Sequence, residues 1–264
     1  MSPGVVGVGH DMASVAASRS STEARHATIG WRAYFERLLS DPLGNVTAVI
    51  VLLTGLGAIA LVGGDVYQRW IGTSTWTLNI DGRFNAVTWF HSFVLAGASM
   101  SALVIAAATA PGDRRRAQTW LFIGLSFAFL SFDKSISFHE RLGQELEETF
   151  GLADEAGRVL WQAVYAPFLA ALVFVLFRIM DQDVARYRRL IVIAIGLCAS
   201  KLALEALMLP AIEWGVTSEQ GVLYGLEVNL EESVQLMGFG LFFATFAALM
   251  LDELARTGLS RSPS

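Results

Sequence analysis

The stretch Leu130–Glu140 holds four ionisable side chains where the chain should still be inside a membrane. They follow directly from the apolar run Trp120–Leu130, which is typical of a membrane-spanning helix. A charge inside the bilayer costs about 3 kcal/mol on insertion scales, so such residues are usually held by partners and usually serve a function. The stretch therefore marks a candidate site, and its ionisable residues are Asp133, Lys134, His139 and Glu140.

Polar side chains of other expected helices fall at the same depth as this stretch. At 1.5 Å per residue, Asp133 lies roughly 20 Å along its helix, in the half of the membrane that we assign to the outside. The inner half holds few comparable side chains. The sequence therefore predicts one polar cluster, and its further members are His91, Tyr165, Lys201, Glu205, Glu227, Glu231 and Gln235.

The residue types in this cluster suit three kinds of function. Carboxylates beside lysine and histidine suit the binding or translocation of a small cation, a proton or a polar solute, which is the first hypothesis. The second is a membrane-embedded, metal-dependent enzyme at the outer leaflet, with zinc or iron as the metal and a lipid-like substrate. The third is a non-catalytic subunit or scaffold. The ligands proposed for the second hypothesis are His91, Asp133, His139, Glu140 and Glu231.

Helical phase divides the cluster into faces. Asp133 and Glu140 share one face of their helix, and Glu227, Glu231 and Gln235 share one face of the last helix. The phase therefore predicts that these two faces lie opposite each other.

Other members fall outside these two faces. Lys201 and Glu205 form an i, i+4 pair, whereas Lys134 and His139 point away from the Asp133 face. Asp133 is either a functional carboxylate or a structural ion-pair partner of Lys134 or Lys201.

The composition is that of an integral membrane protein. Of 264 residues, 54% are hydrophobic and 16% are charged, against about 25% charged residues in soluble domains. The mean hydropathy is +0.50. The net charge of −5 and the lack of a basic tract argue against nucleic acid as a partner. The single cysteine, Cys198, excludes a disulfide framework within the chain.

Six segments are long and apolar enough to span a bilayer, which needs about 20 such residues. We therefore expect an all-α bundle of six transmembrane helices over residues 44–252, embedded in the lipid bilayer, and the oligomeric state is left open. The expected spans are Val46–Gly63, Trp89–Ala110, Trp120–His139, Trp161–Met180, Leu190–Leu209 and Leu226–Leu251.

Lysine and arginine set the expected orientation. Basic residues gather before the first span, between the second and third spans, and around the end of the fourth, whereas the connection after the third span is acidic. The positive-inside rule then places both termini in the cytoplasm, and we expect a bacterial inner (plasma) membrane. Trp70, Trp89, Trp161 and Trp214 would lie at the outer interface.

The remaining segments are assigned by composition. Residues 1–30 are expected to be a disordered cytoplasmic N-terminus, and residues 253–264 a cytoplasmic tail. Residues 31–43 are either an interfacial amphipathic helix or the first turns leading into the first span. Asp81-Gly82 between two alternating stretches predicts an outer β-hairpin over residues 74–88.

Part of the chain resembles a family of uncharacterised bacterial multi-pass membrane proteins. The residues that carry the resemblance are Asp81-Gly82-Arg83-Phe84-Asn85, Trp89-Phe90-His91-Ser92, Ser131-Phe132-Asp133 and His139-Glu140-Arg141-Leu142-Gly143, with a weaker echo at Leu230-Glu231-Glu232. They span about a third of the chain. Lys134 stands where that family is expected to have an acid, which weakens a cation site built from adjacent carboxylates. The resemblance implies a membrane location and no particular activity.

Overall fold

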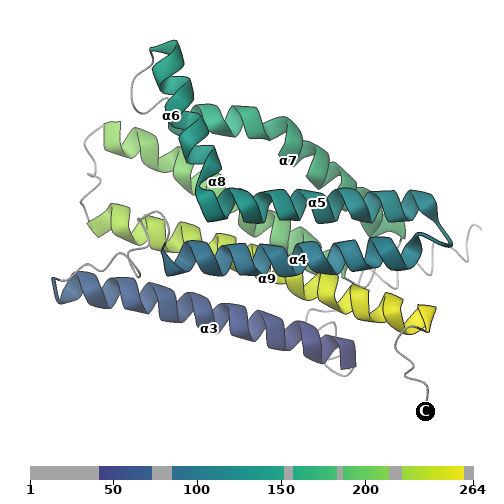
Figure 1. The fold of residues 1–264 in the computed structure, drawn as a ribbon. Coiled ribbons are helices and arrows are strands. Elements are labelled where there is room, and N and C mark those ends of the chain that lie inside the picture. The colour runs from purple at the N-terminus through teal and green to yellow at the C-terminus, as the bar shows by residue number, and fades with distance from the viewer. Residues whose placement is uncertain (1–41, 73–84, 152–156, 183–186, 214–221, 259–264) are drawn as a thin grey trace, which may run out of the picture. The chain divides into compact units, whose positions relative to one another are not determined.

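The computed structural model describes residues 42–72, 85–151, 157–182, 187–213 and 222–258. All regular structure in these residues is α-helical, so the all-α prediction is confirmed for the described part of the chain. The helices, in chain order (Figure 1), are α3 (Pro42–Trp70), α4 (Ala86–Thr109), α5 (Arg114–Ile136), α6 (Phe138–Phe150), α7 (Gly157–Gln182), α8 (Arg188–Glu213) and α9 (Val222–Thr257).

The chain divides into two compact units, Met1–Asn45 and Val46–Ser264. Only residues 42–45 of the first unit are described, and they begin α3. The predicted N-terminal segment 1–30 lies outside the described residues, as do residues 31–41 of the predicted interfacial helix.

Five of the described helices are long and apolar enough to cross a membrane: α3, α4, α5, α7 and α9. Each contains most or all of one predicted span. The predicted span Leu190–Leu209 falls on α8, where the side chains of 205, 206 and 208–213 are not among those described. The helices that contain the first and last predicted spans are longer than those spans. In particular, α9 runs to Thr257 and takes up the first residues of the predicted tail 253–264.

The predicted hairpin 74–88 is wrong in its last residues. Asn85 is the N-cap of α4, and its side-chain oxygen accepts a hydrogen bond from the backbone N–H of Thr88 at 2.8 Å. Asparagine is among the preferred N-cap residues, because it satisfies an N–H that the first turn leaves without a partner. Residues 86–88 are therefore helical. Residues 73–84 lie outside the described residues.

Helix α9 is the central helix of the described unit. It packs against α4 on one side and α8 on the other, and α4 packs in turn against α5 (Figure 1). Close approach to α8 occurs at Gly238, because a Cβ there would lie 3.1 Å from the Ala194 carbonyl oxygen. Helix α7 packs on α6 and makes only sparse contacts with α5 and α8.

The third predicted span is interrupted. Ser137 adopts the left-handed conformation (φ 51°, ψ 46°), which ends α5 at Ile136 and starts α6 at Phe138. The prediction of one continuous helix over Trp120–His139 is therefore wrong. The helical phase of α5 therefore does not extend to the residues of α6, among them His139 and Glu140.

Four aromatic rings form a cluster in the interior. Along the helices, this cluster lies farther from α6 than Asp133 does. This aromatic cluster comprises Trp120 and Phe127 of α5 with Phe242 and Phe246 of α9. Trp120, Phe127 and Phe246 are fully buried, and neighbouring rings have centroids 5.1 to 5.9 Å apart. Edge-to-face pairs such as Trp120–Phe246, at an interplanar angle of 89°, pack densely.

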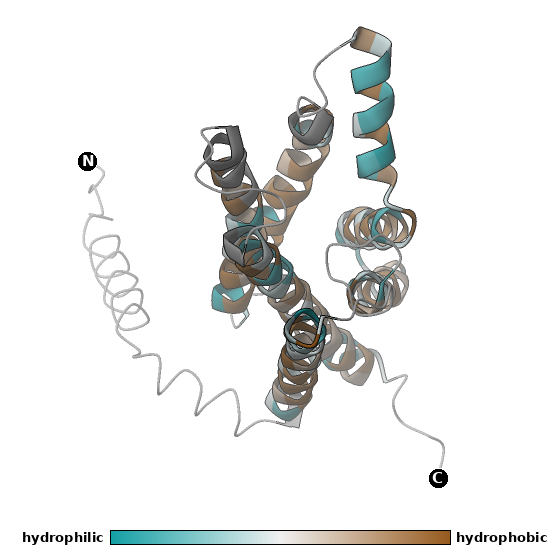
Figure 2. Cartoon of the chain, turned by 90° about the vertical axis from the view of Figure 1, so that its left-hand side faces the viewer, coloured by the Kyte–Doolittle hydropathy of each residue, from teal (hydrophilic) through white to brown (hydrophobic). Residues whose placement is uncertain are grey.

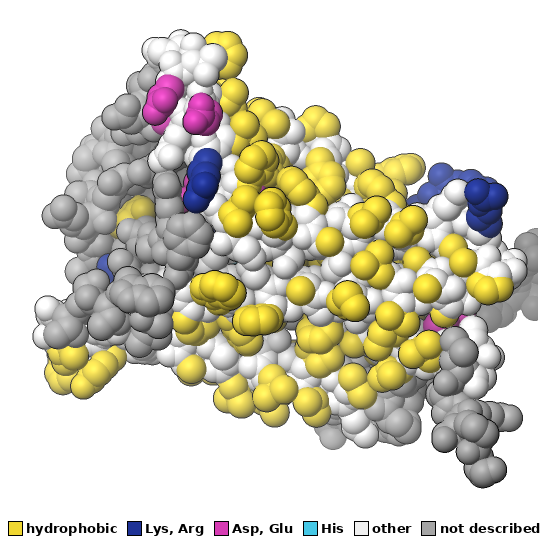
Figure 3. Space-filling model, viewed as in Figure 1, with side chains coloured by type: hydrophobic (Ala, Val, Ile, Leu, Met, Phe, Trp, Pro, Cys, Tyr) yellow, Lys and Arg dark blue, Asp and Glu magenta, His cyan; other side chains and the backbone are white. Residues whose placement is uncertain are grey.

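The surface agrees with a membrane environment. Hydrophobic side chains cover much of the face shown in Figure 3, and many large ones are exposed, among them Leu52, Phe93, Leu125 and Phe174. Helix α6 is the hydrophilic exception (Figure 2), with four glutamates in thirteen residues. Acidic side chains thus gather at the α6 end, whereas Arg114–Arg116 begin α5 at the opposite end.

Candidate functional site

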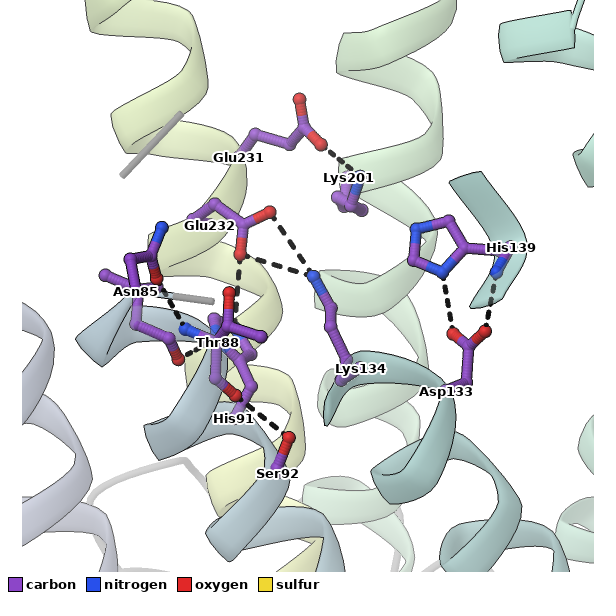
Figure 4. Close-up of polar contacts among 11 residues, drawn as sticks. Asn85, Thr88, His91, Ser92, Asp133, Lys134, His139, Lys201, Glu231 and Glu232 are labelled. Atoms are coloured by element: carbon purple, nitrogen blue, oxygen red, sulfur yellow. Dashed lines mark hydrogen bonds and ion pairs between the residues drawn. The ribbon is translucent and has the colours of Figure 1, made fainter. Parts of the chain in front are cut away.

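The polar side chains of six helices, α4 to α9, meet near the α6 end of the bundle. They form three contacting groups (Figure 4), which we together call the polar layer. The polar layer consists of His91, Asp133, Lys134, His139, Tyr165, Lys201, Glu231 and Glu232.

The first group is centred on the Asp133 carboxylate, which is buried and accepts three hydrogen bonds. Its donors are the backbone N–H of His139 at 2.9 Å, the His139 ring nitrogen Nδ1 at 2.7 Å and the Tyr165 hydroxyl at 2.9 Å. The break at Ser137 makes this possible, because it turns the start of α6 back over the end of α5. Asp133 thus caps α6 and ties it to α7.

The second group joins three helices through Glu232 of α9. Lys134 of α5 places its ammonium nitrogen 3.4 Å from both carboxylate oxygens of Glu232. His91 of α4 places Nε2 at 3.6 Å from Oε2 of the same carboxylate. The His91 ring is fully buried, whereas the side chains of Lys134 and Glu232 are 15% and 18% exposed. Only the last two therefore reach solvent.

The orientation of the His91 ring is fixed by the backbone. Its Nδ1 lies 2.9 Å from the carbonyl oxygen of Val87, which can only accept, so Nδ1 carries a hydrogen. The ring edge also packs against Phe239, at an interplanar angle of 88°. His91 therefore presents Nε2 to Glu232, and no hydrogen-bond partner lies within reach of Nε2 among the described residues.

The third group is a buried ion pair between Lys201 of α8 and Glu231 of α9. Glu231 and its neighbour Glu232 point to different helices, because adjacent residues on a helix are about 100° apart. Both nevertheless find a cation, because Lys201 of α8 and Lys134 of α5 approach α9 from different sides. Replacing one partner of such a pair is costly, since it leaves an uncompensated buried charge.

Several predicted site residues lie elsewhere than expected. Glu231 contacts Lys201 and does not face Asp133. Helical phase was also wrong for His139, which contacts Asp133 because of the break at Ser137. The expected partner of Lys201, Glu205, lies on α8 with its side chain outside the described part.

Three further predicted residues lie around the polar layer. Glu140 occupies the first turn of α6, where its negative charge interacts favourably with the positive end of the helix dipole. Glu227 is buried on α9, and Gln235 lines a cavity that adjoins the layer.

Sequence reasoning missed Glu232, although it is the acid that faces both Lys134 and His91. The available signal was the pair of adjacent glutamates on a helix expected to be buried on several sides. The predicted metal ligands are distributed over separate groups: His91 faces Glu232, Asp133 faces His139, and Glu231 faces Lys201. Across the described ranges, no three histidine, cysteine, aspartate or glutamate side chains gather so that they could hold a metal ion.

Comparison with known proteins gives a family and nothing more specific. No curated protein matches the chain, and no solved structure does. The family described as "Domain of unknown function (DUF8692)" matches residues 46–250, which include every residue of the polar layer. The chain belongs to this family.

Proposed function

We propose that the protein is a multi-pass membrane protein that binds a proton within the membrane, between His91 and Glu232. The geometry of this contact is the observation that carries the proposal. Because His91 Nδ1 donates to Val87, a neutral ring turns the lone pair of Nε2 toward a carboxylate oxygen 3.6 Å away. Two acceptors then face each other, and one added proton converts the contact into a charge-assisted hydrogen bond.

The charge balance of the polar layer supports a proton at this place. The polar layer contains three carboxylates and two ammonium groups: Lys134 faces Glu232 and Lys201 faces Glu231, whereas Asp133 faces His139. With both imidazoles neutral, these five groups sum to one negative charge. Uncompensated charge in a region poor in water is expensive, and one imidazolium removes it. Histidine is also the side chain whose charge most readily changes near neutral pH.

A proton fits this site better than a metal cation. Metal cations such as Zn²⁺ and Fe²⁺ need several ligands around one point, whereas each carboxylate of the polar layer already faces a lysine or a histidine. A metal ion would have to displace these partners. A proton needs one acceptor only. The metal-dependent enzyme considered above therefore gains no support from the described residues.

The aromatic cluster supports binding from one side rather than conduction across the membrane. Its rings lie between α5 and α9, on the side of the polar layer that is farther from α6. The buried hydroxyl groups of α4 and α5 donate to carbonyl oxygens. Ser99 donates to Gly124, Thr109 to Ile105 and Ser126 to Phe122. Among the described residues, side chains engaged in this way do not form a continuous polar path, and we infer that the proton enters and leaves at the α6 end.

The orientation belongs to the same proposal. We infer six spans, with α8 as the additional one, in a bacterial plasma membrane with both termini in the cytoplasm. The basic start of α5 and the acidic α6 lie at opposite ends, in keeping with the positive-inside rule. Single cysteines introduced at Arg115 and Glu145 in a Cys198→Ser background test it. Only the cysteine at position 145 should react with an impermeant thiol reagent added to intact cells; reaction at position 115 instead would reverse the orientation.

Proton uptake by the protein in lipid vesicles tests the binding proposal. A pH indicator counts the protons taken up between pH 8 and pH 5, for the unaltered chain and for His91→Asn and Glu232→Gln. Both variants should take up about one proton fewer, since without Glu232 an imidazolium would face Lys134 alone. Glu145→Gln, on the exposed side of α6 and outside the polar layer, is the matched control and should differ little from the unaltered chain.

Two outcomes would contradict the proposal. Equal uptake by the unaltered chain and His91→Asn would mean that His91 never takes a proton, and a structural scaffold would then explain the polar layer. A pH gradient that decays faster across vesicles containing the protein than across empty ones would refute one-sided access.

A further inference from the structure

A cavity of about 200 Å³ adjoins the polar layer and is lined by residues of α4, α5, α6, α7, α8 and α9. Most of its lining is apolar, and Phe127 and Phe242 of the aromatic cluster contribute to it. An apolar cavity of about 150 Å³ already accepts a benzene molecule. The cavity is therefore large enough for a ring or a short segment of alkyl chain.

One end of the cavity is polar. His139, Tyr165, Lys134, Lys201 and Gln235 all contribute to its lining. The first four belong to the polar layer. The carbonyl oxygen of the Gln235 side chain is buried, and no donor lies within hydrogen-bond distance of it among the described residues. A buried acceptor of this kind is costly unless a donor reaches it, so the cavity offers a place for a donor.

The charges around the polar end decide which head group fits. Lys134 and Lys201 already face Glu232 and Glu231, and the Asp133 carboxylate already accepts three hydrogen bonds. An anionic head group would add to the negative charge of the polar layer, and a cationic head group would lie beside the ammonium groups of Lys134 and Lys201, which line this end of the cavity. A hydroxyl group would add no charge, and it both donates and accepts.

We propose that this cavity binds a neutral amphiphile, with an apolar body in the cavity and a hydroxyl head that donates to the Gln235 carbonyl oxygen. The hydroxyl oxygen accepts in turn from the donors at the polar end. The amphiphile would enter from the bilayer beside α7, because this helix makes only sparse contacts with α5 and α8. The inference goes beyond the proton site, since it depends on the cavity and on Gln235 rather than on His91.

Quenching of Trp161 fluorescence tests the inference on the full-length protein in detergent. Trp161 lines the cavity, and its ring centroid lies 4.7 Å from that of His139. The probe is an octanol that carries bromine on the carbon next to the hydroxyl-bearing carbon. Trp161→Phe gives the background from the other six tryptophans. The alcohol should quench the Trp161 signal in a saturable manner, and the matching bromo-octanoate anion should do so at least tenfold more weakly.

Two pairs of variants locate the binding. Val173→Phe fills the cavity from α7 and should raise the half-quenching concentration at least tenfold, whereas Val164→Phe, on the exposed side of the same helix, should not. Gln235→Leu should raise it about fivefold, the effect of one neutral hydrogen bond. His91→Asn should leave it unchanged, which separates this inference from the proton site.

Two results would overturn the inference. Equal quenching in Val173→Phe and Val164→Phe would show that the probe acts from the detergent phase. Tighter binding of the anion than of the alcohol would show that the head group is charged.

Discussion

Replacing Asp133 by asparagine keeps the shape of the side chain and removes its charge, so it isolates what the carboxylate does at the α5–α6 break. The asparagine oxygen can still accept from the backbone N–H of His139 and from Tyr165. Its amide group, however, would face His139 Nδ1, where the carboxylate now accepts at 2.7 Å. One charge-assisted hydrogen bond is lost, and the His139 ring must carry its hydrogen on Nε2 before Nδ1 can accept from the amide.

The size of this loss can be bracketed. A hydrogen bond to a charged group contributes about 1.5–3 kcal/mol. Polar contacts between transmembrane helices contribute less when measured by double-mutant cycles, about 0.6 kcal/mol on average and about 1.7 at most. We therefore expect Asp133→Asn to lower the free energy of unfolding by about 1–2 kcal/mol. Asp133→Ala leaves all three donors without their partner and should cost about 3 kcal/mol.

The assay is reversible unfolding of the protein in mixed micelles by added dodecyl sulfate, followed by circular dichroism. A double-mutant cycle with Tyr165→Phe measures the Tyr165–Asp133 contact, for which we expect a coupling of about 1 kcal/mol. Hydrogen exchange of the His139 amide provides a local readout and should accelerate in Asp133→Ala. Equal stability of the unaltered chain and Asp133→Ala, with no coupling to Tyr165, would refute the assignment of Asp133 as the cap of α6.

Three further predictions concern the packing around the polar layer. Ser137→Val should lower the unfolding free energy by about 1–2 kcal/mol more than Ser137→Gly in the same micelle titration, because only glycine adopts φ near +51° without strain. Gly238→Ala should cost about 1–3 kcal/mol, since its Cβ would press on α8; at Gly196 nothing lies within 4 Å of an added Cβ, and the same change should not destabilise. Lys201→Met should cost about 3–5 kcal/mol, and combining it with Glu231→Leu should restore most of the loss. Equal losses of stability in Gly238→Ala and Gly196→Ala would contradict the close approach at Gly238. A Lys201→Met, Glu231→Leu double variant no more stable than Lys201→Met would contradict the buried ion pair.

The long helices could be predicted because their signal is local. An apolar run of about 20 residues indicates a span whatever its neighbours are, so α3, α4, α7 and α9 lie where the sequence places them. The gathering of polar side chains near one end also follows from the sequence, because the alternating direction of the spans fixes the depth of each residue.

The break at Ser137 could not be predicted in this way. Serine is compatible with a helix, and its neighbours Ile136 and Phe138 give no stop signal. The left-handed turn places the His139 amide and ring on Asp133, and Tyr165 joins them from a distant part of the chain. The turn is therefore accompanied by contacts between helices. It also explains why His139 faces Asp133, although the phase of one continuous helix would place the two side chains on different faces.

The ion-pair partners of the two glutamates on α9 could not be predicted from the sequence for a related reason. Helical phase shows that Glu231 and Glu232 point in different directions, but not which neighbour each one meets. This depends on the packing of α9 between α4 and α8. Glu232 consequently contacts Lys134 and His91, whereas Glu231 contacts Lys201.

The protonation state of His91 tests the central claim most directly. Nitrogen NMR of the reconstituted protein, labelled with ¹⁵N-histidine, distinguishes a ring nitrogen that bears hydrogen from one that does not, and His91→Asn assigns the signal. We predict that Nδ1 bears hydrogen throughout, whereas Nε2 changes from bare to hydrogen-bearing as the pH falls from 8 to 5. A Nε2 signal that stays in one state over this range, in protein that remains folded, would contradict it.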